Sequence, residues 1–192
     1  MAVFASRQIV LPKMVNFVNY IQSHGTEWID TGLTANQNTR VEAVVTATET
    51  QDAGAVFGAE QTFQDRMFAI DAYGCFYGST VYQWSSLQAN VERKVEAVGN
   101  KFYLDNALVY TAATLSFQTP VTLTMFGFNV AASNSVTQLI KAKMKYLKIW
   151  QDGATLSRDF KPCLDRNGVP CMYDTVSKSY FYNQGSGTFG YG

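Results

Sequence analysis

The chain has 192 residues, 47% of them hydrophobic and 14% aromatic, which is enough for one domain with a large core. Charged residues make up 16% and sum to a net charge of zero, so the chain offers no basic excess to a nucleic-acid backbone. It has no apolar run near the ~20 residues that a membrane-spanning helix needs, and no secretory signal pattern at its start. We therefore expect no nucleic-acid partner and no membrane partner.

The first predicted element is an extended N-terminal arm over residues 1–15. Pro12 interrupts it, and a proline in an extended segment is typical of an edge or docking strand rather than a central one. Residues 16–192 follow as a single predicted domain, because no low-complexity linker or internal repeat divides them. We interpret the arm as a candidate anchor.

Alternating polarity predicts the strands that come next. Residues 40–48, 91–97 and 121–125 each alternate apolar and polar side chains, as strands with one buried and one wet face do. A dozen or more short strands, with turn residues between them, are typical of sandwiches and jelly rolls. The sequence therefore predicts an all-β fold, a two-sheet antiparallel β-sandwich of the jelly-roll kind.

Turn residues and lysines refine the second half of this prediction. Asp105-Asn106 favours a tight hairpin, and Asp152-Gly153 favours another, between strands predicted at residues 146–150 and 154–160. Residues 133–144 are the best helix candidate, but their propensity is poor and we expect no more than one short turn there. Lys141, Lys143 and Lys145 share one predicted strand face, which we interpret as solvated and as a guard against edge pairing.

The three cysteines are Cys75, Cys163 and Cys171. An odd, small number does not form a disulfide framework, so we expect buried, reduced thiols. Cys163 and Cys171 bracket a predicted turn and could approach each other across it. The sequence leaves open whether they pair.

The sequence offers few candidate catalytic residues. Retaining glycoside hydrolysis needs two carboxyls about 5 Å apart. Glu92 and Glu96 share a strand face but lie ~13 Å apart along an extended strand. A pair assembled across strands stays open, so a glycoside hydrolase is the less favoured alternative. His24 is the only histidine and is expected in a solvated loop. We expect no catalytic residue, no metal and no cofactor.

Binding chemistry is better represented, in the aromatic stretch at residues 71–86. Sugar sites combine aromatic faces with a few amide or carboxylate groups. Aromatic side chains on strands more often fill the core, and that alternative stays open. The residues of this predicted glycan patch are Asp71, Tyr73, Tyr77, Tyr82, Gln83 and Trp84.

Several motifs, taken in order, resemble a known family. They are residues 20–32 (YIQSHGTEWIDTG), residues 38–42 (NTRVE), Phe57-Gly58-Ala59, residues 156–163 (LSRDFKPC), Gly168, Tyr173-Asp174, residues 181–183 (FYN) and residues 185–189 (GSGTF). Together they are similar to concanavalin A-like (laminin-G-like) jelly-roll modules, which occur in bacteriophage structural proteins and in surface proteins of gut bacteria. The resemblance covers about residues 17–190. The chain departs from the family pattern at Glu27, Trp28 and Cys171-Met172, so no ligand residue is carried over.

This resemblance implies a binding or structural role. We expect a non-enzymatic bacteriophage protein of the virion surface, as a head decoration, head fibre or tail-associated protein. Its expected task is to stabilise the particle, to adhere to glycans, or both. The arm over residues 1–15 is expected to contact other virion proteins of the capsid or tail, and display in many copies implies a homo-oligomer or lattice. The alternative is a carbohydrate-binding or adhesin domain on the bacterial cell surface.

Overall fold

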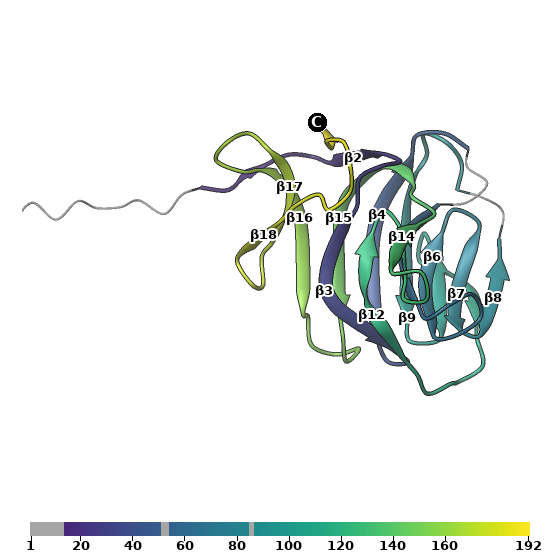
Figure 1. The fold of residues 1–192 in the computed structure, drawn as a ribbon. Coiled ribbons are helices and arrows are strands. Elements are labelled where there is room, and N and C mark those ends of the chain that lie inside the picture. The colour runs from purple at the N-terminus through teal and green to yellow at the C-terminus, as the bar shows by residue number, and fades with distance from the viewer. Residues whose placement is uncertain (1–13, 51–53, 85–86) are drawn as a thin grey trace, which may run out of the picture.

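Two β-sheets pack face to face in the computed structural model, which describes residues 14–50, 54–84 and 87–192 (Figure 1). No helix occurs in these described ranges. The predicted all-β sandwich of two antiparallel sheets is therefore confirmed, and it is compatible with a jelly roll. Residues 1–13 of the predicted arm lie outside the described residues.

The larger sheet has 11 strands and carries the longest strand of the fold at its centre. Its main path runs β11-β10-β9-β4-β15-β16-β17-β18, with β1 beside β16, β2 beside β15 and β19 beside β2. The strands are β1 (Asn16–Phe17), β2 (Ile21–His24), β4 (Arg40–Ala47), β9 (Glu92–Val98), β10 (Lys101–Leu104), β11 (Ala107–Thr111), β15 (Lys141–Trp150), β16 (Arg158–Leu164), β17 (Pro170–Asp174), β18 (Ser179–Phe181) and β19 (Gly190–Tyr191).

The smaller sheet has 8 strands. Strand β5 pairs with β6 and β12 in antiparallel fashion and with β13 in parallel, and β3 extends the sheet beyond β12. The strands are β3 (Ile29–Asn36), β5 (Ala55–Glu60), β6 (Met67–Asp71), β7 (Gly74–Gly78), β8 (Thr80–Gln83), β12 (Gln118–Met125), β13 (Phe128–Val130) and β14 (Ser135–Thr137).

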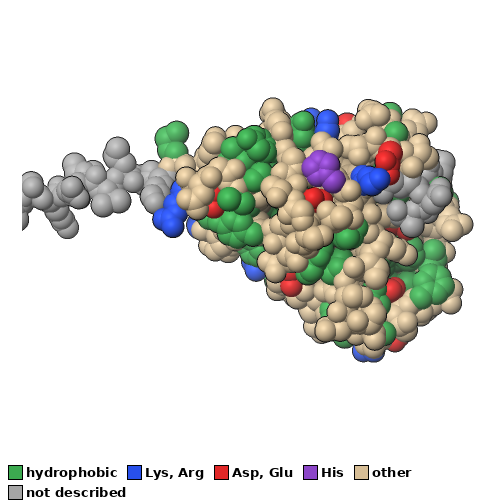
Figure 2. Space-filling view, turned by 45° about the horizontal axis from the view of Figure 1, so that its top comes forward, with side chains coloured by type: hydrophobic (Ala, Val, Ile, Leu, Met, Phe, Trp, Pro, Cys, Tyr) green, Lys and Arg blue, Asp and Glu red, His purple; other side chains and the backbone are tan. Residues whose placement is uncertain are grey.

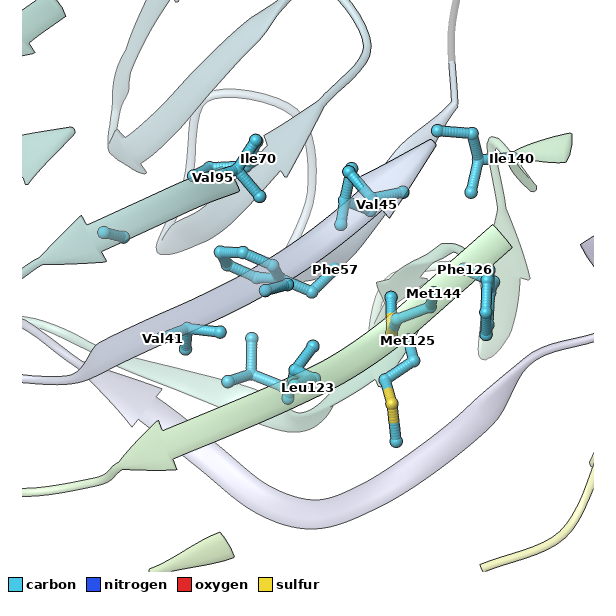
Figure 3. Packing of buried hydrophobic residues seen from close by; sticks show 14 of the residues in the cluster. Val41, Val45, Phe57, Ile70, Val95, Leu123, Met125, Phe126, Ile140 and Met144 are labelled. Atoms are coloured by element: carbon cyan, nitrogen blue, oxygen red, sulfur yellow. The ribbon is translucent and has the colours of Figure 1, made fainter. Parts of the chain in front are cut away.

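One apolar core lies between the sheets. Val41 and Met144 of the larger sheet and Phe57, Leu123 and Met125 of the smaller sheet belong to it and are at most 1% exposed (Figure 3). Each such side chain contributes about 1.5–3 kcal/mol on burial, so the alternating apolar positions supply the main stabilisation of the sandwich.

Strands β5, β6 and β7 are buried on both faces, which explains their continuous apolar sequence. A second, smaller apolar cluster lies on this part of the sheet, away from the main core. Within it the edge of one ring meets the face of another, with 5.3 Å between the ring centroids of Phe76 and Phe128.

The predicted turns are largely confirmed. Asp105 and Asn106 both have positive φ, at 50° and 67°, and close the β10–β11 hairpin. Gly153 has φ of 82° in the link between β15 and β16, but β16 begins only at Arg158, so the strand predicted from residue 154 was placed too early. Residues 133–144 contain β14 and the start of β15 rather than a helix.

Strand β15 contains an irregularity that the alternation did not predict. Its register against β4 shifts between Met144 and Tyr146. Before the shift Ala142 and Met144 point into the core, and after it Leu147 and Ile149 do. A β-bulge therefore lets one strand keep two different phases of alternation against the same core.

Candidate functional site

A cleft of about 440 Å³, the Trp28 cleft, lies over β3, β12, β13 and β14, three of which are labelled in Figure 1. Its lining combines one indole with amides, hydroxyls and a few apolar groups, and every lining side chain is uncharged. The lining residues are Trp28, Thr34, Pro120, Val121, Thr122, Asn129, Asn134, Ser135 and Val136.

Trp28, directly before β3, is held by the C-terminal segment. Its backbone N–H donates to Asn183 Oδ1 at 3.1 Å, and its carbonyl accepts the N–H of Gln184 at 2.9 Å. Gly185 packs against the indole, because a Cβ there would lie only 2.8 Å from Trp28 Cδ1. The ring is half-buried. The position of the indole is therefore fixed by residues that lie at the other end of the sequence.

The start of β3, directly after Trp28, is fixed by local hydrogen bonds. Asp30 Oδ1 accepts the N–H of Gly32 at 2.8 Å, and Thr31 Oγ1 accepts the N–H of Leu33 at 3.3 Å. Gly32 has φ of 71°, a conformation that glycine adopts without steric cost. Asp30 and Thr31 therefore fix a local irregularity at Gly32 within β3, whose register against β12 shifts in this region.

A buried carboxylate supports the segment before Trp28. Glu27 is 2% exposed and accepts hydrogen bonds from the N–H of His24 at 2.7 Å and from Ser23 Oγ at 3.3 Å. Burial alone would raise the pKa of Glu27, but hydrogen bonds from His24 and Thr26 lower it below its ordinary value. The carboxylate therefore acts as an internal acceptor that shapes the loop.

The polar wall of the cleft comes from neighbouring strands. Thr34 of β3 and Thr122 of β12 are cross-strand partners. Asn129 of β13 is fixed by its Nδ2, which donates to the carbonyl of Thr122 at 2.9 Å. Ser135 shares a 2.8 Å hydrogen bond with Ser133 in the turn that leads into β14. These contacts give the cleft a set of preformed hydroxyl and amide groups beside one aromatic ring.

Such a lining suits a neutral, polyhydroxylated ligand. Aromatic rings stack on the apolar faces of sugars, and amides and hydroxyls exchange hydrogen bonds with their hydroxyl groups. Sequence reasoning did not select this cleft. In the sequence, Trp28 stood out only as a departure from a family pattern. The residues that line the cleft are spread along the chain from Trp28 to Val136. The sequence carries no local signal that joins them.

The predicted glycan patch at residues 71–86 is distributed over buried and half-buried positions. Asp71 is 5% exposed, and its Oδ1 accepts the N–H groups of Tyr73 and Gly74 at 2.7 and 2.6 Å. Tyr77 is 1% exposed and its hydroxyl donates to the carbonyl of Gln37 at 3.3 Å. The polar atoms of these two residues are thus engaged inside the domain.

The other members of the predicted patch lie nearer the surface. Tyr73, Tyr82 and Trp84 are half-buried and pack against the core, and Gln83 is exposed. Tyr82 stacks on Tyr110 with 4.3 Å between ring centroids and 6° between planes. Trp84 Nε1 donates to the carbonyl of Ala72 at 3.4 Å. A glycan role for these residues stays a prediction.

A carboxylate pair assembled across strands does exist, on the outer face of the larger sheet. Glu42 of β4 and Glu96 of β9 are cross-strand partners, and Arg40 Nη2 lies 3.2 Å from Glu42 and 2.7 Å from Glu96. Lys94 Nζ lies 3.1 Å from Glu42, and the Tyr146 hydroxyl donates to Glu42 Oε1 at 2.9 Å. Burial would raise the pKa of Glu42, but these hydrogen bonds and charges lower it on balance, so Glu42 is kept ionised.

His24 ends β2, is 54% exposed in its side chain, and appears as the purple side chain in Figure 2. Its predicted exposure is confirmed, although it lies at a strand end rather than in a loop. Within residues 14–50, 54–84 and 87–192, no three His, Cys, Asp or Glu side chains gather closely enough to hold a metal ion.

Each of the three lysines on the predicted lysine face contacts another side chain. Lys141 and Lys145 form ion pairs with Glu49 and Glu92 at 2.8 and 2.6 Å, and Lys143 lies over the ring of Tyr20.

Over the part of the chain that is described, there is no helix long and apolar enough to cross a bilayer. No protein-family model matches this chain, and no curated protein matches it either.

Proposed function

We propose that this domain is a non-catalytic binding module that holds a neutral glycan in the Trp28 cleft. The observation that carries the proposal is the placement of Trp28, fixed by Asn183 and Gly185, in a cleft lined by amides and hydroxyls. Charged ligands gain nothing from this lining, whereas a sugar can use both its ring face and its hydroxyl groups.

The chemistry of the carboxylates supports binding rather than hydrolysis. None of the residues that line the Trp28 cleft carries a carboxylate. The Glu42–Glu96 pair lies on the other sheet, and its charges are matched by Arg40 and Lys94. A glycosidase acid needs a raised pKa so that it holds a proton near neutral pH, whereas the pKa of Glu42 is lowered.

A glycan array with the full chain tests the proposal. We expect binding to a subset of neutral oligosaccharides, with about a tenfold loss in Trp28→Ala, because one stacking contact is worth roughly 1–1.5 kcal/mol. Trp28→Tyr, which keeps an aromatic face, should retain most of the signal. Trp84→Ala is the matched control, since Trp84 is also half-buried and lies outside the cleft.

The controls separate the two candidate locations. Loss of signal in Trp84→Ala with normal signal in Trp28→Ala would move the site to the predicted patch at residues 71–86. Absence of binding by the parent protein would reject the glycan function. Sustained release of sugar from glucans, lost in Glu42→Gln, would reject the non-catalytic assignment.

We further propose that the module is displayed on a bacteriophage particle as a concanavalin A-like jelly roll. The resemblance over residues 17–190 supports this, and so does an exposed aromatic surface at the end where the described chain begins. Figure 2 shows hydrophobic side chains gathered at this end. The aromatic surface consists of Phe17, Tyr173, Tyr180 and Tyr182, and Phe17 and Tyr182 are 50% and 40% exposed.

Particle incorporation tests this second proposal. Removing residues 1–15 should abolish incorporation of the protein into particles while leaving its thermal transition near that of the full chain. Normal incorporation of the truncated protein would reject the arm as an anchor. Neighbouring genes for polysaccharide use, rather than for capsid and tail proteins, would favour the bacterial cell-surface alternative.

A further inference from the structure

Two thiols face each other beneath the aromatic surface. Cys163 of β16 and Cys171 of β17 are direct cross-strand partners, and their Sγ atoms lie 3.5 Å apart. Both residues are 0% exposed and neither forms a disulfide. The third cysteine, Cys75, is also buried but lies on β7 of the other sheet. The chain therefore contains one adjacent pair and one isolated thiol.

The register of β16 against β17 is compatible with a bond between the pair. The N–H of Thr175 donates to Asp159 and that of Asp165 to Val169, which places hydrogen-bonded pairs at every second position. Pro162, which has no N–H, then falls in a non-hydrogen-bonded pair. Cys163 and Cys171 form a hydrogen-bonded pair, for which Cα atoms lie about 5.5 Å apart. That separation is within the range that disulfides span.

The pair lies on the outer face of the larger sheet. Phe160 and Met172, which alternate with the two cysteines along β16 and β17, belong to the main core. Phe17 of β1, a neighbouring strand in the same sheet, is the cross-strand partner of Cys163, so the two side chains lie on the same face. Strand β1 is only two residues long, and both are exposed. Local opening of this short strand is thus a low-cost route by which a small molecule reaches the thiols.

We propose that Cys163 and Cys171 form a modification site, a dithiol that a small-molecule disulfide such as oxidised glutathione converts into an intrachain disulfide. One protein sulfur attacks the small disulfide, forms a mixed disulfide and releases one thiolate. The second protein sulfur, after losing its proton, attacks the first and releases the other thiolate. The protein loses two protons and two electrons, and one molecule of the small disulfide becomes two thiols.

The electrostatics of the pair indicate the order of attack. The two Sγ atoms share a hydrogen bond in which either sulfur can donate, and this contact lowers the pKa of Cys163 in spite of its burial. The same hydrogen bond, together with burial, raises the pKa of Cys171. We expect Cys163 to be the attacking thiolate and Cys171 the resolving thiol.

Thiol counting in glutathione buffers tests the proposal. The full chain is brought to equilibrium over a series of reduced-to-oxidised ratios, both as native protein and after refolding from denaturant in the same buffers. It is then quenched in acid, denatured and titrated. In the oxidising buffers we expect only the Cys75 thiol to remain titratable, with one peptide containing both Cys163 and Cys171 lighter by two hydrogens.

Two variants serve as matched controls. Cys75→Ser keeps the pair and should lose all titratable thiol under oxidation, whereas Cys163→Ser should form no intrachain bond. The proposal is overturned if every thiol stays titratable in the most oxidising buffer after refolding. It is also overturned if the parent protein accumulates stable glutathione adducts in place of the Cys163–Cys171 bond.

Discussion

Asn183 Oδ1 accepts the backbone N–H of Trp28 at 3.1 Å across 155 positions of the sequence. The same oxygen accepts the N–H of Gly185 at 2.9 Å, and Asn183 Nδ2 donates to the carbonyl of Gly187 at 3.1 Å. One amide side chain thus shapes the C-terminal glycine loop and joins it to the segment that carries the aromatic ring of the cleft.

Asn183→Ala should therefore destabilise the domain by about 1–3 kcal/mol, because it leaves the N–H groups of Trp28 and Gly185 without their acceptor. Urea unfolding measures this loss. Asn167→Ala, at an exposed turn position, should stay within about 0.5 kcal/mol of the parent. Equal stability of the two variants would show that the Asn183 contacts contribute nothing.

Gly185→Ala should be more damaging than an alanine placed at Gly168. A Cβ on Gly185 would collide with the carbonyl oxygen of Thr26 and lie 2.8 Å from Trp28 Cδ1, so the loop or the indole must move. We expect a cost of about 2 kcal/mol or more. At Gly168 a Cβ meets nothing within 4 Å and only the positive φ of 77° opposes it, at about 1–2 kcal/mol. Thermal unfolding of both variants checks the order.

Asp71→Asn should stabilise the domain at high pH. Burial raises the pKa of Asp71 to about 6, in spite of the hydrogen bonds from Tyr73 and Gly74. Because the folded-state pKa is above the unfolded value, stability falls as the pH rises from about 4 to about 6, by up to about 3 kcal/mol. Asparagine keeps an acceptor for both N–H groups without the charge. The gain should appear at pH 8 and shrink toward zero at pH 4 in urea unfolding, and a less stable variant at pH 8 would contradict this.

Asp174→Ala should have the opposite pH signature. Asp174 is 0% exposed and accepts the N–H groups of Asp159, Val176 and Ser177 at 2.8, 3.1 and 3.0 Å, with Arg158 Nε 3.6 Å away. Burial would raise its pKa, but these hydrogen bonds lower it below 3.8. We expect the variant to lose about 3 kcal/mol at neutral pH.

The loss in Asp174→Ala should decrease in acid. Because the folded-state pKa of Asp174 is depressed, its contribution is complete above the unfolded value and disappears as the pH falls through the folded value. The difference between parent and variant should therefore be constant above about pH 5 and narrow below about pH 4. A difference that grows in acid would contradict the assignment.

Sequence patterns predicted the local elements where each residue's preference acts alone. The alternation at residues 40–48 and 91–97 matches β4 and β9, and the positive φ of Asp105 and Asn106 matches the predicted hairpin. The same reasoning placed the start of β16 too early. The intervening loop uses Asp152 Oδ1 as acceptor for the N–H groups of Ala154 and Thr155, in place of a strand partner.

The site was beyond such reasoning, because it depends on contacts between distant segments. Aromatic density favoured residues 71–86, yet the buried position of Tyr77 follows from ring contacts with Phe102 and Phe117 on other elements. Trp28, by contrast, has no cluster of aromatic residues near it in the sequence. Its contacts with the C-terminal segment form only in the folded chain.

By itself, the order of apolar and polar residues determined that this chain forms strands and packs them in two layers. A strand with one apolar face is stable only when that face is buried against another sheet. Only the tertiary structure decided where the bulge in β15 falls, which carboxylates meet cations, and which indole lies in a cleft. These outcomes depend on which strands become neighbours. The pairing energy between two remote segments cannot be predicted from either segment alone.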